Sequence, residues 1–272
     1  MGVTVVDDKI YVLSGSIGSV LVYQARDPFS FIDEIAIPEI TSPWDIAGSS
    51  ESSCLYISDK DTSCVWKVSL TEVEKDGWFG SERYEHLVSR WLCGISEPHT
   101  LSISNDGTML LLLVGNPPRL ETYDHDSTLI RSLELPLDVE DPRHALESST
   151  GTYVISYGWS GTKTQGLVEL ASDGRVLRTN EPLNEWQQLK NPHHLAIDAE
   201  NRVYVADFYN NRVLLLDSNL HWDQREVLTE DKNGISKPHR LSLDRDNKHL
   251  IVAHSDGGKV DVYTLEETAQ AS

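Results

Sequence analysis

The stretch Asn191–Val213 reads NPHHLAIDAENRVYVADFYNNRV and contains the signals that decide the fold. Pro192 precedes alternating apolar residues, Glu200-Asn201 supplies turn-forming residues, and a second apolar segment follows at Arg202–Ala206. Alternation is typical of a half-buried strand, and Pro fits the first position of a strand because its missing N–H breaks no ladder bond there. The stretch therefore predicts a β-hairpin that begins at Pro192.

The same frame recurs along the chain: Pro, a large side chain, any residue, then an apolar residue. It is found at Pro43-Trp44-Asp45-Ile46, Pro98-His99-Thr100-Leu101, Pro142-Arg143-His144-Ala145 and Pro238-His239-Arg240-Leu241, with steps of 44 to 55 residues between successive Pro. Further short strands follow each frame, and four antiparallel strands over roughly 45 residues are the signature of a propeller blade.

Residues 2–40 add a unit without the leading Pro, which brings the total to six. The sequence therefore predicts an all-β fold, a single six-bladed β-propeller of four-stranded antiparallel blades over residues 1–272. We expect the blades at 2–40, 41–95, 96–139, 140–189, 190–235 and 236–265, followed by a polar tail at 266–272. The last unit offers only three strands, so the ring closes by face packing alone or the chain is cut from a longer parent; the sequence leaves both open.

Charge and cysteine content bear on partners and location. The formal net charge is −20, which repels phosphate backbones and argues against nucleic-acid binding. The longest apolar run, Met109–Val114, is far short of a membrane span, and the N-terminal residues lack the pattern of a secretory signal. Cys54 and Cys64 are expected near opposite ends of a hairpin, which disfavours a disulfide between them. Free thiols and the absence of a glycosylation sequon predict a cytoplasmic protein.

The stretch quoted first closely resembles an NHL repeat, whose pattern is a Pro-led strand, a turn, a V-Y-V-A-D strand and then N-x-R-V. The resemblance is strong over residues 190–216 and elsewhere holds mainly as spacing. It implies a structural role for Asp207, Asn211 and Arg212, because in such repeats the Asp and Arg tie adjacent hairpins together. The NHL domains of tripartite-motif ubiquitin ligases, RNA-binding propellers, peptidyl-hydroxyglycine amidating lyase and, more distantly, gluconolactonase-like propellers share this architecture.

The residue after each Pro is expected at one mouth of the central channel: Trp44, His99, Arg143, His193 and His239, with Gly2 nearest to an equivalent in the first unit. Three imidazoles converging there suit Zn²⁺, and the amidating lyase is similar in placing zinc-binding His after Pro. That enzyme uses alternate blades, however, whereas His99, His193 and His239 fall in units three, five and six. The alternative is that these His are polar groups hydrogen-bonded to backbone or water.

Other residues carry further hypotheses. His144 and His194 are expected to point to the opposite face of the strand and to pack between blades. Arg143 offers a bidentate fork for a small anionic ligand at the mouth. Calcium-dependent lactonase chemistry needs oxygen ligands lining the channel, for which Asp45 and Glu147 are candidates.

Aromatic residues in predicted loops suggest partner binding. Trp78 and Phe79 lie in a long polar insertion, and apolar aromatics in such loops are frequent interface anchors; folding back onto the blade edge is the alternative. Trp159 and Tyr209 lie at the ends of second strands, whose loops face one rim.

The sequence thus favours an interaction module that binds a protein or peptide partner through rim loops and channel mouth, with no catalytic residue and no cofactor. The alternative is a Zn- or Ca-dependent lyase or hydrolase of the amidating-lyase or gluconolactonase-like type.

Overall fold

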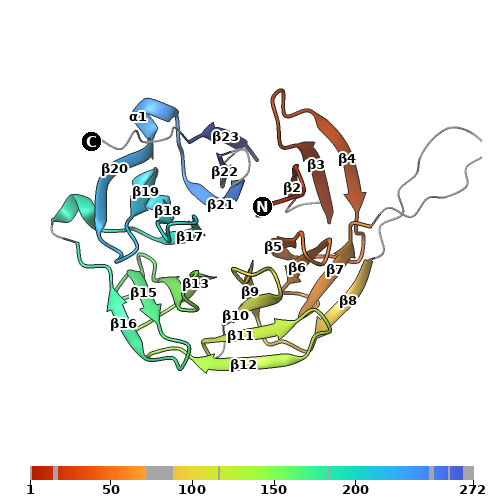
Figure 1. The fold of residues 1–272 in the computed structure, drawn as a ribbon, viewed down its shortest axis with the longest axis horizontal. Helices are drawn as coiled ribbons and strands as arrows, with labels where there is room; N and C mark the ends of the chain where they lie inside the picture. Colours follow the sequence, from red (N-terminus) through yellow and green to blue (C-terminus); the bar gives the residue numbers. More distant parts are fainter. Residues whose placement is uncertain are drawn as a thin grey trace, which may run out of the picture.

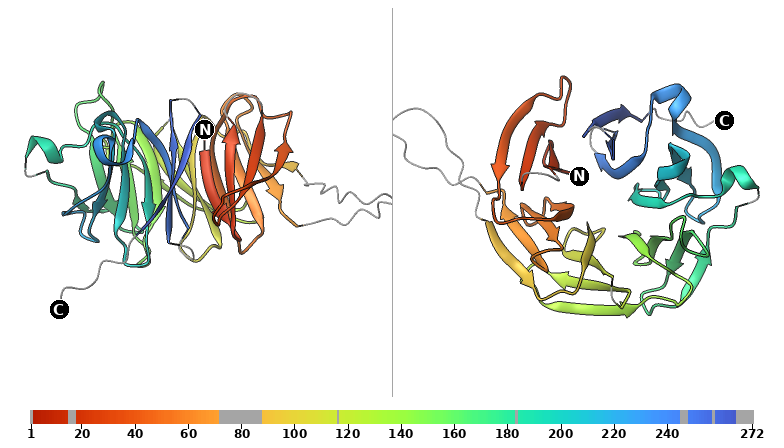
Figure 2. Two further views of the ribbon diagram at one scale, coloured as in Figure 1. Left: turned by 90° about the horizontal axis from the view of Figure 1, so that it is seen from above. Right: turned by 180° about the vertical axis from the view of Figure 1, so that it is seen from behind.

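Six sheets stand around a central axis, and the chain runs through them in order (Figure 1). The computed structural model describes residues 2–14, 18–71, 88–115, 117–182, 184–244, 248–256 and 258–265. Five sheets have four antiparallel strands and the last has three, with the strands of each sheet paired in sequence order. The predicted six-bladed propeller with a three-stranded last blade is confirmed. Figure 2 shows the blades edge-on, packed side by side into a disc.

The first strand of each blade lies nearest the axis and the last lies at the periphery. The first three blades are β1 (Gly2–Val6), β2 (Lys9–Ser14), β3 (Ser19–Gln24) and β4 (Phe31–Ala36); β5 (Pro43–Ser49), β6 (Cys54–Asp59), β7 (Cys64–Ser69) and β8 (Val88–Cys93); β9 (Pro98–Ile103), β10 (Met109–Val114), β11 (Arg119–Asp124) and β12 (Leu129–Glu134). The other three are β13 (Pro142–Glu147), β14 (Tyr153–Tyr157), β15 (Gly166–Leu170) and β16 (Val176–Thr179); β17 (Pro192–Ile197), β18 (Val203–Asp207), β19 (Arg212–Leu216) and β20 (Trp222–Thr229); β21 (Pro238–Asp244), β22 (His249–His254) and β23 (Val260–Thr264).

Helical structure in the described residues is confined to short connections. These are the 3₁₀ turns η1 (Glu185–Gln187) and η2 (Phe208–Asn210) and the single-turn helix α1 (Glu230–Asn233). No helix in this part of the chain has the length and hydropathy of a membrane span.

The core lies between blades rather than within them. Each of six hydrophobic clusters joins the facing sides of two neighbouring blades, as Ile46 and Ile57 of the second blade do with Val20 and Ile35 of the first. Among the described residues, the cluster between the last blade and the first has six buried members, whereas the other five clusters have nine to fourteen. In the part of the chain that the structure describes, the last and first blades therefore meet by face packing, and this seam has the smallest core.

The cysteine expectation was wrong. Cys64 and Cys93 form a disulfide, and Cys54 is free and buried. The two bonded residues lie directly opposite each other on β7 and β8, with Cα atoms 4.1 Å apart. A long insertion separates these strands in the sequence, so the register that brings the cysteines together could not be read from hairpin spacing. The argument from free thiols to a reducing compartment therefore does not hold.

Candidate functional site

The inner strand of five blades carries a β-bulge directly after its Pro. In the fifth blade, Pro192 pairs with Asp207 and His194 pairs with Ala206, so two steps along β17 match one step along β18. The same irregularity follows the leading Pro in β5, β9, β13 and β21, whereas β1 pairs without one. Because a bulge opposes two residues to one, strict alternation of faces is broken at that point. Both residues after the Pro can then lie on the axial side.

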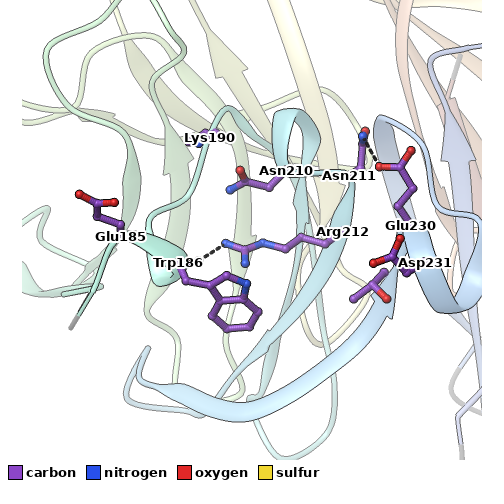
Figure 3. Close-up of a pocket in the computed structure, with 9 residues that line it drawn as sticks. Glu185, Trp186, Lys190, Asn210, Asn211, Arg212, Glu230 and Asp231 are labelled. Atoms are coloured by element: carbon purple, nitrogen blue, oxygen red, sulfur yellow. Dashed lines mark hydrogen bonds between the residues drawn. The ribbon is translucent and has the colours of Figure 1, made fainter.

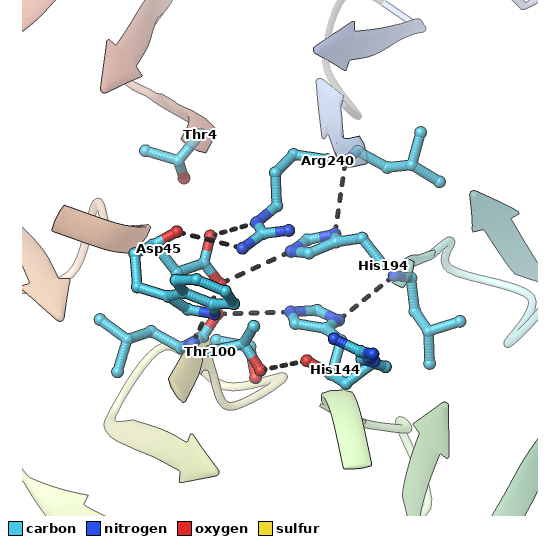
Figure 4. Close-up of polar contacts among 12 residues, drawn as sticks. Thr4, Asp45, Thr100, His144, His194 and Arg240 are labelled. Atoms are coloured by element: carbon cyan, nitrogen blue, oxygen red, sulfur yellow. Dashed lines mark hydrogen bonds and ion pairs between the residues drawn. The ribbon is translucent and has the colours of Figure 1, made fainter. Parts of the chain in front are cut away.

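Six side chains meet at the axis, one from each inner strand (Figure 4). Five of them are the second residue after the leading Pro, whereas Thr4 lies further along its strand, because it pairs with Tyr11 as Ala47 pairs with Tyr56. We call the six residues the axial ring: Thr4, Asp45, Thr100, His144, His194 and Arg240. All six are buried. His144 and His194 point toward the axis because of the bulge, and not to the opposite face of the strand as expected, but they do pack between blades as the sequence predicted. Alternation without a bulge was the assumption that failed.

Each member of the ring bonds to the inner strand of a following blade. Asp45 Oδ2 accepts the backbone N–H of Leu101 at 3.1 Å, and the Thr100 hydroxyl donates to the carbonyl of Arg143 at 2.7 Å. Thr4 Oγ1 accepts from the N–H of Gly48 at 3.1 Å. The two histidines continue this pattern, so a circuit of hydrogen bonds runs around the channel from blade to blade.

His144 and His194 stack on each other, with ring centroids 3.5 Å apart. Nδ1 of His144 accepts the N–H of Leu195, and Nδ1 of His194 accepts the N–H of Leu241, each at 3.3 Å. A ring nitrogen that accepts a hydrogen bond is unprotonated, so each neutral imidazole carries its proton on Nε2. Burial lowers the pKa of both groups below the ordinary value, which keeps them neutral at physiological pH.

Arg240 completes the circuit by passing over the first blade. Its Nε donates to Asp45 Oδ1 at 2.8 Å and its Nη2 donates to the carbonyl of Trp44 at 3.0 Å, both on β5. Asp45 and Arg240 are 195 residues apart, and their side chains are at most 1% exposed. Burial alone would raise the pKa of Asp45, but the Arg240 guanidinium, followed by His194, holds that pKa well below its usual range. The pair is therefore ionised, and it bridges the seam with the smallest core.

This arrangement bears on metal binding. In the described residues, one group of His, Cys, Asp or Glu brings three ligand atoms within 4.8 Å, and it is Asp45, His144 and His194. Its carboxylate already neutralises Arg240, whose guanidinium lies 2.8 Å away. A cation placed there would face a fixed positive charge, so the group fits a structural network better than a metal centre.

The second residue set lies at the channel mouth, above the axial ring. We call it the mouth: Trp44, His99, Arg143, His193 and His239, the five residues that directly follow Pro. Arg240 Nη1 approaches Nδ1 of His193 at 2.9 Å and Nδ1 of His239 at 3.2 Å, and the two imidazole centroids lie 4.0 Å apart. Because Arg can only donate, both Nδ1 atoms are acceptors and both rings are neutral.

The three-His hypothesis is not favoured by this geometry. His99, His193 and His239 do not form a metal-ligand group among the described residues, and the free lone pairs of two of them are taken by Arg240. Burial, followed by the charge of Arg240, lowers the pKa of His239 to about 2. These imidazoles therefore present N–H groups rather than lone pairs to the channel.

The other side of the mouth holds Lys60, which the sequence did not single out. Its Nζ lies 3.8 Å from the centroid of the Trp44 ring, and Trp44 contacts His99 with centroids 5.7 Å apart. Arg143 pairs with Asp141 through one Nη, while its Nε is buried without an acceptor. Lys60 could have been found only by knowing that the loop after β6 returns to the mouth.

Aromatic residues border the mouth on loops. The Phe208 ring lies 5.7 Å from His193 and 5.0 Å from Tyr209, whose side chain is 51% exposed. Trp159 is 44% exposed in the loop after β14. Trp78 and Phe79 lie outside the described residues.

Beneath the axial ring, the channel contains a cavity of about 520 Å³. Its walls include Thr4 and His194 at the ring and Glu51, Asp106 and Glu147 at the far end. Glu147 accepts the N–H of Asn105, and burial raises its pKa. Asp45 lies in the ring instead, paired with Arg240, so the two carboxylates suggested as calcium ligands are not grouped.

A smaller pocket of about 310 Å³ opens beside β19, around Trp186 and Arg212 (Figure 3). Arg212 Nε donates to Asp207 at 2.7 Å, and Asp207 also accepts the N–H of Lys190. Arg212 Nη2 donates to the carbonyl of Trp186, and its guanidinium lies 4.7 Å from that ring.

These contacts tie the fifth blade to the loop that precedes it. Asn211 links the fifth blade to the last blade, because its side-chain oxygen accepts the N–H of Lys237 at 2.9 Å, directly before β21. The structural role that the resemblance implies for Asp207, Asn211 and Arg212 agrees with this geometry.

Comparison with known proteins agrees with the resemblance to NHL-repeat propellers. A model of the NHL repeat matches residues 189–214. NHL repeat-containing protein 3 of Mus musculus is 23% identical over 235 residues, covering 80% of this chain. The match covers 63% of that relative, so the chain spans less than two thirds of its length. The resemblance to NHL-repeat propellers is thereby confirmed.

Solved structures with very different roles share the fold. A hydrazine synthase of Kuenenia stuttgartiensis has a TM-score of 0.64 at 16% identity, covering 97% of this chain and 95% of its own. A chain of a nidogen/laminin complex has a TM-score of 0.63 at 15% identity, with 94% and 93% covered. Virginiamycin B lyase from Staphylococcus aureus has a TM-score of 0.61 at 10% identity, with 98% and 84% covered. At such identities the likeness shows the fold alone.

Proposed function

We propose that this six-bladed NHL-repeat propeller is an interaction module that binds a protein or peptide partner at the channel mouth and the surrounding loops. The observation that carries the proposal is the contrast between two depths of the channel. The axial ring is buried and saturated with hydrogen bonds, whereas the mouth above it keeps half-buried aromatic and N–H-bearing side chains. Binding residues held on a rigid scaffold are the usual arrangement of an interaction site.

Exposed aromatic residues extend the surface outward from the mouth. Tyr209 and Trp159 stand on loops next to the mouth, and large aromatic side chains supply much of the binding energy at protein interfaces. Recognition ends of tripartite-motif proteins, which this chain resembles, and the propeller in a nidogen/laminin complex give a precedent for macromolecular recognition by this fold. A metal-dependent enzyme has less support, because Arg240 occupies the acceptors of both candidate metal groups.

A cytoplasmic location stays a prediction, and the Cys64–Cys93 disulfide counts against it because disulfides are uncommon in reducing compartments. The oxidation state of these cysteines in protein isolated from cells by rapid alkylation distinguishes the two environments.

Peptide selection tests the proposed function. A displayed library of random linear peptides would be selected on the immobilised protein, and each recovered peptide measured against wild type and the variants Trp44→Ala and Tyr209→Ala. We expect at least tenfold weaker binding by these variants, with unchanged binding by Phe31→Ala, an equally exposed aromatic of the outer strand β4. Thermal melts of each variant separate lost contacts from lost folding. Failure to recover peptides, or peptides that bind all variants equally, would contradict the proposal.

A further inference from the structure

The chemistry of the mouth specifies what it binds, given the proposed function. Lys60 Nζ has no carboxylate within ion-pair distance among the described residues and lies instead over the Trp44 ring. Arg143 has five N–H donors, of which one Nη group pairs with Asp141. His193 and His239 present Nε2–H because their Nδ1 atoms face Arg240. The mouth is thus rich in donors that lack protein acceptors.

The positive groups at the mouth also act on one another. Burial, together with the charges of Lys60, Arg143 and Arg240, lowers the pKa of His99 to about 4. Burial lowers the pKa of Lys60, the Glu97 carboxylate opposes this effect, and Arg143 adds to it. Half-buried cations that repel one another are stabilised by an anion placed between them. This concentration of positive charge is notable in a chain whose formal net charge is −20.

Gly115 lies beside the His99 ring at the mouth. At Gly115 a Cβ atom would lie 3.1 Å from His99 Nε2 and 2.9 Å from Glu97 Oε2. A side chain at this position would crowd both the His99 imidazole and the Glu97 carboxylate, so glycine is required beside these two groups. The acidic groups Glu97 and Asp141 beside the two cations make a dianion such as a phosphate monoester a poorer match than a monoanion.

From this geometry we infer that the mouth recognises a carboxylate group of its partner, held by Lys60, Arg143 and His99, with the adjoining apolar part of the ligand against Trp44. A carboxylate accepts several hydrogen bonds at once, and Arg presents donors in a matching planar fork. An acidic side chain or a free C-terminus of a peptide supplies such a group.

A pair of small probes tests this inference: phenylacetate and its uncharged counterpart phenylacetamide, titrated into the intact protein. Binding is followed by calorimetry and by the NMR signals of the histidine rings. We expect at least tenfold tighter binding of phenylacetate, and an upward shift of the His99 pKa in its presence, because a bound anion stabilises imidazolium. Phenyl phosphate serves as the dianionic comparison and is expected to bind more weakly than phenylacetate.

Lys60→Met and Arg143→Gln should each reduce the preference for the carboxylate at least threefold. Arg175→Gln, which removes an exposed cation from the turn between β15 and β16 at the opposite end of the blade, should leave it unchanged. Equal binding of acid and amide, no binding of either probe, a stronger response to phenyl phosphate, or mouth variants that behave as the control would each overturn the inference.

The interaction module and the carboxylate site can be rejected independently of each other. Selected peptides that depend on Trp44 while the probe pair shows no preference would retain the interaction module and reject the carboxylate. A clear carboxylate preference with peptides that ignore the mouth would reject the module and retain the carboxylate site.

Discussion

Replacing Arg240 by Met tests whether the axial ring holds the propeller closed. The side chain of Arg240 is fully buried, and Asp45, its partner at 2.8 Å, is 1% exposed. Met matches the length of the arginine stem but leaves the Asp45 carboxylate without its counter-charge. The carboxylate would keep only the N–H of Leu101 and the more distant Nε2 of His194, 3.7 Å away.

The expected cost follows from the burial of the pair. Breaking a buried ion pair by removing one partner destabilises a protein by about 3–5 kcal/mol, because an uncompensated charge stays buried. We therefore expect Arg240→Met to lower the free energy of unfolding by about 4 kcal/mol. The double variant Asp45→Asn, Arg240→Met removes both charges while keeping an acceptor for Leu101, and should recover at least about 2 kcal/mol of that loss.

Urea denaturation of wild type, both single variants and the double variant gives the coupling energy. Arg26→Met provides the matched control, since Arg26 pairs with Asp8 at 2.7 Å with side chains 62% and 44% exposed. An exposed pair of this kind contributes about 0–1 kcal/mol. A loss for Arg240→Met no larger than that of the control, or additive effects of the two ring substitutions, would refute the reasoning that the pair bridges the seam.

Three further predictions concern pH, metal and redox state. The free energy of unfolding should fall as the pH is lowered from 6 to 4, because burial holds the pKa values of His144, His193 and His194 below the ordinary value and the unfolded chain then binds protons that the folded protein does not. Each such histidine contributes at most about 1.4 kcal/mol per pH unit. A free energy of unfolding that is flat across this range in urea denaturation would contradict the depressed pKa values. Zinc at tens of micromolar should leave the melting temperature of wild type unchanged because Arg240 already neutralises Asp45, and a stoichiometric zinc content after dialysis would show otherwise. Cys64→Ala should lower the free energy of unfolding by about 3 kcal/mol, because the Cys64–Cys93 disulfide closes a loop with a sequence separation of 29. Wild type in dithiothreitol should have the same stability as the variant. If the reductant does not change the stability of wild type, the disulfide does not form.

The fold could be predicted from the sequence because its signals are local. Pro at a strand start, alternating apolar residues and turn residues recur at blade spacing, and the strand β17 begins at Pro192, where the hairpin was predicted to begin. The three-stranded last blade could be predicted for the same reason. These signals depend on neighbouring residues and need no knowledge of long-range contacts.

The site could be predicted only in part. The sequence identified the positions after Pro, but it carried no signal for the bulge that brings His144 and His194 to the axis. The bond between Asp45 and Arg240 joins residues at opposite ends of the chain, so only the closed ring reveals it. Lys60 was missed because its place over Trp44 depends on how a loop returns to the channel.

Because of the bulge after each Pro, residues at two depths of the channel can have different functions. In a regular strand only one of the two residues that follow the Pro would face the channel, and its side chain would have to serve both closure and recognition. Here the inner position carries the bonds that hold the blades together, and the outer position is released from that duty in most blades. A propeller built in this way can acquire a new binding specificity by substitution of the residue directly after a proline. The hydrogen bonds that join the blades are made by the next residue and are not affected.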